Sequence, residues 1–228
     1  MAKEKTFLLV VLFLLHFLLW GSETENDSGW KDAKLNTASS INFLSTFEKE
    51  IILEINKLRS NPAKYANDYI LPLQNKYKKK YLHYPGDFPL ITKEGVKALN
   101  ECVSELRKQK PLPIIYPVKG LCQAAADHVK DQSRSGKTGH VGRDRSKVRD
   151  RIERYGEWET RIAENIAYGG ITPQQVVIYL LIDDGIHDRG HRKNFLHPDF
   201  KTVGVATGGH PHYVTMCVMD FAGLFRSF

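Results

Sequence analysis

The segment that most restricts how this chain folds is Val176–Ile182, where seven hydrophobic residues follow one another without interruption. Thr172-Pro173-Gln174-Gln175 precedes it and is typical of a helix start, because Thr is a good N-cap, Pro suits the first helical position and Gln three residues after the cap completes a capping box. A helix that is hydrophobic on all sides is buried. We therefore expect a buried helix that stops at Asp183-Asp184-Gly185.

Other helices are expected where hydrophobic residues recur at three- and four-residue steps. The first follows the capping box Ser45-Thr46-Phe47-Glu48 and ends at Ser60, and a second helix starts at Pro62. Three more are expected at 92–108, 120–133 and 146–155. Strands are expected at 162–168, 202–206 and 213–221, with the last two joined as a hairpin across Gly208-Gly209-His210-Pro211. Because helices come first and short strands come late, the predicted fold class is α+β.

The N-terminus has the pattern of a secretory signal peptide. Lys3 and Lys5 precede a hydrophobic run at 7–20, and small residues follow at Gly21 and Ser22. The alternative is an uncleaved membrane anchor, but the run is shorter than the roughly 20 residues that span a bilayer as a helix. We interpret residues 1–22 as a signal peptide, 23–44 as a flexible linker and 45–228 as one folded domain of a secreted protein without a transmembrane span in its mature form.

A secreted chain with three cysteines can form at most one internal disulfide. Cys102–Cys122 is the pair to test first, whereas Cys217 lies in a hydrophobic run and is interpreted as a small buried residue. Stability must therefore come mainly from packing. Asn26-Asp27-Ser28 in the linker is an acceptor sequence for N-glycosylation if the host is a eukaryote.

The chain has 33 Lys and Arg against 26 Asp and Glu, a formal charge of +7, which favours acidic partners without indicating a specific nucleic-acid site. Two segments concentrate this charge. Residues 76–81 read Lys-Tyr-Lys-Lys-Lys-Tyr, and residues 130–154 contain nine Lys or Arg and four Asp or Glu. A solvated surface is the favoured interpretation, and contact with an anionic polysaccharide or membrane surface is the alternative.

Two polar features lie next to buried segments. Glu164 shares the alternating face of a predicted strand with Ile162 and Ile166, and a carboxylate there needs a partner. A salt bridge to an arginine is the favoured interpretation. His187 and His191 have a metal-compatible spacing if helical, but Gly185 and Gly190 favour a loop.

Several blocks together resemble the CAP superfamily, also called SCP-like, which includes cysteine-rich secretory proteins, antigen 5 and plant pathogenesis-related proteins. In chain order the blocks are Gly139-His140-Val141-Gly142, Ala163-Glu164-Asn165-Ile166-Ala167, Arg189-Gly190-His191-Arg192, Val203-Gly204-Val205-Ala206 and Met219-Asp220-Phe221-Ala222. The resemblance spans about residues 45–225. The chain lacks the Gly-His-Tyr-Thr-Gln block and the disulfides of animal and plant members, so it is similar to the simpler branch of bacteria and unicellular eukaryotes.

This resemblance implies a three-layer α-β-α sandwich with a cleft of two His and two acidic residues, which in some members holds zinc or another divalent cation. By position, His140 and His191 match the histidines and Glu164 the first acid. The second acid is usually Glu, and here Asp183 and Asp184 are the two candidates, with Asp183 preferred as the metal ligand.

Three functions compete at this stage. The first is a secreted module that binds a small lipid- or sterol-like ligand or an extracellular surface component, with a divalent cation in the cleft and no dedicated catalysis. The second is a metal-dependent hydrolase, a protease or esterase, with Glu164, Asp183 or Asp184 as candidate catalytic groups. No Ser or Cys in these blocks has an evident nucleophile arrangement, which argues against acyl-enzyme chemistry. The third assigns binding to the basic segments around Lys78 and Arg145.

Overall fold

A computed structural model of the chain describes residues 29–30 and 33–228. The predicted signal peptide, the first part of the predicted linker and Asn26 lie outside the described residues. One compact unit extends from Asp32 to Phe228, and the description below concerns this unit. No helix in the described part of the chain is long and apolar enough to span a bilayer.

The helices occur from the start of the unit to Phe195, with strand β5 (Gly156–Tyr168) between α6 and α7. The α-helices are α2 (Thr46–Ser60), α3 (Pro62–Tyr65), α4 (Val96–Lys108), α5 (Lys119–Ser135), α6 (Val148–Glu153), α7 (Pro173–Ile182) and α8 (Gly190–Phe195). Three short helical turns complete the set: η1 (Ala33–Leu35), η2 (Ala66–Ile70) and η3 (Leu71–Lys76).

The strands form two sheets. The main sheet has the order β4-β6-β7-β5, with β4 (Tyr116–Pro117) parallel to β6 (Thr202–His210), and β7 (Val214–Ser227) antiparallel to both β6 and β5 (Gly156–Tyr168). The strand β5 is therefore an edge strand. The second sheet, β1-β2-β3, contains three two-residue strands, β1 (Tyr77–Lys78), β2 (Tyr81–Leu82) and β3 (Leu90–Ile91).

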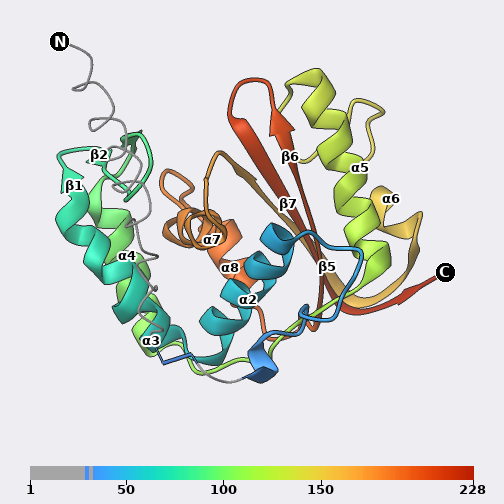
Figure 1. Ribbon diagram of the computed structural model, residues 1–228, viewed down its shortest axis with the longest axis horizontal. Coiled ribbons are helices and arrows are strands. Elements are labelled where there is room, and N and C mark those ends of the chain that lie inside the picture. Colours follow the sequence, from blue (N-terminus) through green and yellow to red (C-terminus); the bar gives the residue numbers. More distant parts are fainter. Residues whose placement is uncertain (1–28, 31–32) are drawn as a thin grey trace, which may run out of the picture. The chain divides into compact units, whose positions relative to one another are not determined.

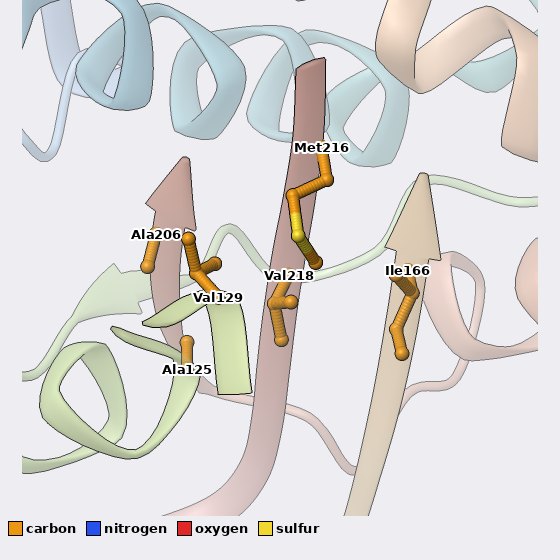
Figure 2. Close-up of a cluster of buried hydrophobic side chains, with 6 residues drawn as sticks. All are labelled: Ala125, Val129, Ile166, Ala206, Met216 and Val218. Carbon is orange, nitrogen blue, oxygen red and sulfur yellow. The ribbon is translucent and has the colours of Figure 1, made fainter. Parts of the chain in front are cut away.

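The main sheet lies between two layers of helices (Figure 1). The helices α5 and α6 pack on one face, and α2, α7 and α8 pack on the other. Figure 2 shows Ala125 and Val129 of α5 facing Ala206, Val218 and the other side chains of one buried cluster. This arrangement confirms both the predicted α+β class and the α-β-α sandwich that the resemblance implied.

Gly204 explains how closely α5 approaches the sheet. A Cβ atom at this position of β6 would overlap the backbone of Leu121 and Cys122 in α5. Only a residue without a side chain allows this contact. The α5 layer therefore depends on Gly204.

Local sequence signals predict most helix ends correctly. Ser45 accepts from the backbone N–H of Glu48, whose carboxylate accepts from the Ser45 N–H, so the predicted capping box is formed. Thr172 caps α7 through the Gln175 N–H, although the Gln175 side chain accepts from the N–H of Ile171 rather than that of Thr172. Gly136 ends α5 in the left-handed conformation.

The folded unit begins earlier than the linker boundary at 44 predicts. Leu35 and Ala38 are buried, and the side-chain amide of Asn56 in α2 donates to the Leu35 carbonyl at 2.9 Å. The Thr37 hydroxyl donates to the carbonyl of Ile115 at 2.9 Å. Residues 33–44 therefore form hydrogen bonds with the rest of the domain and are not a flexible linker.

Cys102 and Cys122, the pair to test first for a disulfide, are not bridged, and all three cysteines are free and buried. Cys102 belongs to α4 and Cys122 to α5, which lie on opposite sides of the main sheet in Figure 1. Burial raises the pKa of both thiols to about 12. Cys217 packs inside the sheet, as predicted.

Two further predictions differ from the structure. Residues 76–81, interpreted as a solvated loop, include β1 and the start of β2. Residues 190–195, which Gly190 was expected to keep as a loop, form the helix α8 after Arg189 adopts a left-handed backbone with φ of 51°. In this position Arg189 supplies the conformation that is usual for glycine.

Candidate functional site

The first part of the site joins three elements around Glu164 of the edge strand β5. His140, from the loop between α5 and α6, has its Nδ1 2.8 Å from Glu164 Oε1. Arg151 of α6 donates from Nη2 to Glu164 Oε2 at 2.6 Å, and its Nη1 donates to the carbonyl of Ser146 at 2.9 Å. The Glu164 side chain is buried, whereas that of His140 is 54% exposed. The predicted salt bridge of Glu164 is confirmed, and Arg151 is its partner.

The Glu164 carboxylate is held in its ionised form. Burial by itself would raise its pKa, but the hydrogen bond from His140 and the positive charge of Arg151 hold the pKa below its ordinary value. Directly opposite in the antiparallel register, Asp220 of β7 is fully buried. Burial and the negative charge of Glu164 raise the pKa of Asp220 well above its ordinary value. Of the two carboxyl groups, Asp220 is therefore the one that keeps its proton to higher pH.

The second part of the site is built at the end of α7. Asp183 ends the helix in the left-handed conformation, with φ of 54°. Its Oδ1 lies 2.7 Å from His191 Nδ1, and its Oδ2 accepts from the backbone N–H of His191 at 3.0 Å. Asp184 points elsewhere and accepts from the backbone N–H of Glu94 at 2.8 Å. The structure thus selects Asp183 as the partner of His191.

Arg189 and Arg192 attach α8 to α4 and to the residues just before α4. Arg189 donates to both carboxylate oxygens of Glu94 at 2.7 and 2.8 Å and to both of Glu101 at 2.9 and 2.8 Å. Arg192, which is fully buried, donates to Glu101 and Glu105 at 2.9 and 2.7 Å. Bidentate arginine–carboxylate pairs have a fixed geometry. They therefore hold the segment that carries His191 in place.

The edge strand β5 contacts both parts of the site. Glu164 and Asn165 are consecutive, so their side chains project from opposite faces of the sheet. Asn165 donates to the carbonyl of His191 at 3.1 Å and accepts from Asn194 of α8 at 2.8 Å. The four side chains expected in one cleft form two pairs, His140–Glu164 and Asp183–His191, and β5 contacts both, through Glu164 in the first pair and through Asn165 beside the second.

The comparisons with known proteins place this chain in a family. The family model for the cysteine-rich secretory protein family, CAP, matches residues 101–221. The chain belongs to the CAP family. The comparison with curated proteins finds no match for this CAP protein.

Two solved structures are similar to this CAP protein. One is an extracellular protein containing an SCP domain from Bacillus anthracis str. Ames, with 23% identity and a TM-score of 0.39. The match covers 49% of this chain and 34% of that protein, so this chain spans about a third of the length of the Bacillus protein. The other is an outer surface protein from Borrelia burgdorferi, with 19% identity and a TM-score of 0.40 over 54% of this chain and 86% of that protein.

The two His–carboxylate pairs of this CAP protein offer only some of the ligands that a divalent cation needs. Each histidine meets a carboxylate through Nδ1, and this arrangement typically orients an imidazole for coordination through Nε2. The carboxylates are occupied by these contacts, and in the described part of the chain no group of three or more His, Cys, Asp or Glu side chains is placed to hold a metal ion. Catalytic zinc sites generally use three protein ligands. The donors that the described residues bring together therefore fall short of the ligand set of a catalytic zinc site.

A polar cavity lies beside the first pair. It measures about 240 Å³ and is lined by Arg151 and Ser146 together with His128 and several charged residues of α5 and the following loop. His128 is fully buried, its Nδ1 has no hydrogen-bond partner among the described residues, and burial lowers its pKa. His128, Arg151 and Asp220 had no predicted role at the site. No local pattern distinguishes Arg151 from the other basic residues of 130–154.

Proposed function

We propose that this CAP protein is an extracellular binding module that takes a ligand or partner at the His140–Glu164 and Asp183–His191 pairs, with a divalent cation, zinc or another, bound by the two imidazoles. The observation that carries this proposal is the engagement of both Nδ1 atoms by carboxylates, at 2.8 and 2.7 Å. A carboxylate at Nδ1 favours the tautomer that leaves Nε2 able to coordinate a metal. A bound divalent cation would supply positive charge for an anionic or carbonyl group of the ligand.

Three observations favour binding over hydrolysis. Glu164 is buried and tied to Arg151 at 2.6 Å, so its carboxylate is occupied as an acceptor. Asp183 is occupied in the same way by His191. The three thiols are buried, and burial raises the pKa of each, so none is activated as a nucleophile. The groups that a metal-dependent hydrolase would use thus serve to position the histidines.

The extracellular location and the ligand class belong to the same proposal. The signal-peptide pattern of residues 1–22 supports export. The resemblance supports a small lipid- or sterol-like molecule, or a component of an extracellular surface, as the ligand. The exposed imidazole of His140, held by Glu164 of the edge strand β5, supports a ligand site at the margin of this strand.

Calorimetric titration with zinc tests the cation site. The wild-type chain is expected to bind about one zinc ion per chain, and His140→Ala and His191→Ala are each expected to lose this binding because a single imidazole remains. His187→Ala is the matched control, since His187 is an exposed histidine a few residues from His191. Its binding is expected to equal that of the wild type.

Equal zinc uptake by the wild type and both site variants would remove the cation from the proposal. Loss of uptake in His187→Ala with retention in His140→Ala would move the site to the exposed turn before α8. Glu164→Gln adds a further check, because an amide at this position removes the acceptor charge that orients His140 while leaving the imidazole in place. It is expected to weaken zinc binding on the order of ten- to a hundredfold.

A further inference from the structure

The small sheet β1-β2-β3 presents one face to solvent, and this face combines apolar and basic side chains. In its register, Lys78 is paired with Tyr81, and Tyr81 with Ile91. Directly paired residues on neighbouring strands project from the same face. Lys78, Tyr81 and Ile91 therefore share one face, while Leu82, which projects from the other, is buried.

The apolar side chains of this face are unusually accessible. Phe88, in the segment between β2 and β3, is 88% exposed, Ile91 is 69% exposed and Tyr81 is 46% exposed. Leu90, which is paired with Leu82, projects from the other face. Scattered exposed hydrophobic residues are normal, but several large ones within one fifteen-residue sheet mark a contact surface. We call Tyr81, Phe88 and Ile91 the apolar edge.

Three lysines border the apolar edge. Lys78, Lys79 and Lys80, the hairpin lysines, are all exposed and make no ion pair within the described part of the chain. The acidic groups nearby are already engaged. Glu94 is paired with Arg189, Asp87 accepts from the side chain of Gln175 and from the N–H of Phe88, and Asp184 accepts from backbone N–H groups of 93–94. Asp87 and Asp184 keep their negative charge, because their donors are uncharged amides, but the three hairpin lysines outnumber them and the face has a net positive charge.

We propose that this face docks the protein on a membrane surface that contains anionic phospholipids. Phe and Ile side chains enter the boundary between headgroups and acyl chains, while Tyr places its ring there and keeps its hydroxyl in the polar layer. Lysines reach the phosphates with their ammonium groups and cover apolar surface with their methylene chains. A polysaccharide would use the lysines but would leave Phe88 and Ile91 in water, so the apolar edge favours the bilayer.

This surface is independent of the paired histidines. It is built from residues 77–91, outside the part of the chain that the CAP model matches, and none of its side chains belongs to the His140 or His191 pairs. Its failure in an experiment would therefore not affect the proposed cation site. Conversely, loss of zinc binding would not affect docking.

A fluorescent probe at position 88 tests the proposal in the full chain. Phe88→Cys is labelled with a nitrobenzoxadiazole group under native conditions, where the three native thiols are buried. The probe responds only if position 88 itself leaves water, so the hydrophobic run at 7–20 cannot produce the signal. Val214→Cys, labelled in the same way, is the control, because Val214 is a comparably exposed apolar residue in the β6–β7 turn.

Vesicles of phosphatidylcholine mixed with phosphatidylserine are expected to shift the probe at position 88 to shorter wavelength and to raise its intensity. Pure phosphatidylcholine vesicles are expected to leave it in water, and added salt should weaken the response. The charge variant is Lys78→Gln, Lys79→Asn and Lys80→Gln, in which Asn suits the left-handed backbone of position 79. It should lower the apparent vesicle affinity on the order of a hundredfold.

A control with the same change in net charge at exposed lysines elsewhere consists of Lys119→Gln, Lys130→Gln and Lys137→Gln. It is expected to reduce the affinity far less than the charge variant. A probe at position 88 that stays in water with anionic vesicles would overturn the proposal. So would an equal response to both kinds of vesicle, or heparin binding that depends on the hairpin lysines with no response to vesicles, which would assign the lysines to a polysaccharide.

Discussion

Asp220→Asn tests the inference that a protonated carboxyl group lies beneath the site. Asp220 is fully buried in β7 opposite Glu164, and neither of its carboxylate oxygens has a hydrogen-bond partner among the described residues. Burial and the neighbouring negative charge raise its pKa well above the ordinary value. Asn has nearly the same shape as the neutral acid but takes up no proton. Comparing this variant with the wild type therefore separates the effect of proton binding by Asp220 on the free energy of unfolding from the effect of its packing.

The sign of the effect follows from proton linkage. In the unfolded chain Asp220 ionises near pH 4, whereas in the folded chain it keeps its proton to higher pH. Between these two pH values, folding must take up a proton, so the free energy of unfolding of the wild type falls as pH rises. The loss is about 1.4 kcal/mol per pH unit until the folded carboxyl group ionises. Across that interval the asparagine variant should gain stability steadily on the wild type.

Urea unfolding of both proteins, from about pH 4 to about pH 8, measures this difference in the free energy of unfolding. Groups that titrate alike in both proteins cancel in the comparison. Asp188→Asn is the matched control, because Asp188 is exposed and undergoes the same chemical change. Its difference from the wild type should stay within about 0.5 kcal/mol across the range.

A pH-independent difference between the wild type and Asp220→Asn would refute the reasoning, because it would mean that Asp220 binds no more protons when folded than when unfolded. A wild type that becomes increasingly more stable than the variant toward pH 8 would reverse the sign. In that case the Asp220 carboxylate would be ionised and stabilised by a positive group.

Three further predictions concern the rest of the domain. Arg59→Met removes four donations to backbone carbonyl groups, at 2.7 to 3.0 Å, and should cost at least about 4 kcal/mol in urea unfolding, with Arg59→Lys retaining part of the stability. Gly204→Ala should cost about 3 kcal/mol or more because its Cβ would overlap the α5 backbone, whereas at Gly209 the nearest atom lies 3.7 Å away and Ala should cost under about 1 kcal/mol. All three thiols should react slowly with iodoacetamide in the folded protein and rapidly in urea, so rapid native alkylation would contradict their burial.

The parts of the fold that could be predicted are those fixed by residues close together in sequence. The capping box at Ser45, the Pro at position 62, the cap at Thr172 and the glycine that ends α5 each depend on contacts within one helical turn. The apolar face of Glu164 was also predictable, because alternation along a strand is local. These signals were sufficient for the α+β class.

The parts that could not be predicted depend on contacts between distant segments. Nine basic residues lie within 130–154, and only the placement of α6 against β5 selects Arg151 as the partner of Glu164. Asp183 and Asp184 are adjacent, and their roles differ because the helix ends in a left-handed residue at Asp183. The helix α8 forms despite its glycine because Arg192 and Asn194 bind groups of α4 and β5.

The short sheet β1-β2-β3 was missed for a different reason. Its strands contain two residues each, too few to show alternation, and the lysine run suggested a solvated segment. The pairing becomes visible only when Ile91 lies opposite Tyr81.

The attachment of α8 to α4 has a consequence for acidic surroundings. The pKa values of Glu94 and Glu101 fall to about 2, mainly through their hydrogen bonds with Arg189, so both carboxylates stay charged where ordinary glutamates become neutral. The stabilisation they give is present above about pH 4.5 and fades only as pH falls toward 2. Acidified extracellular fluid would therefore leave the segment that carries His191 attached to α4.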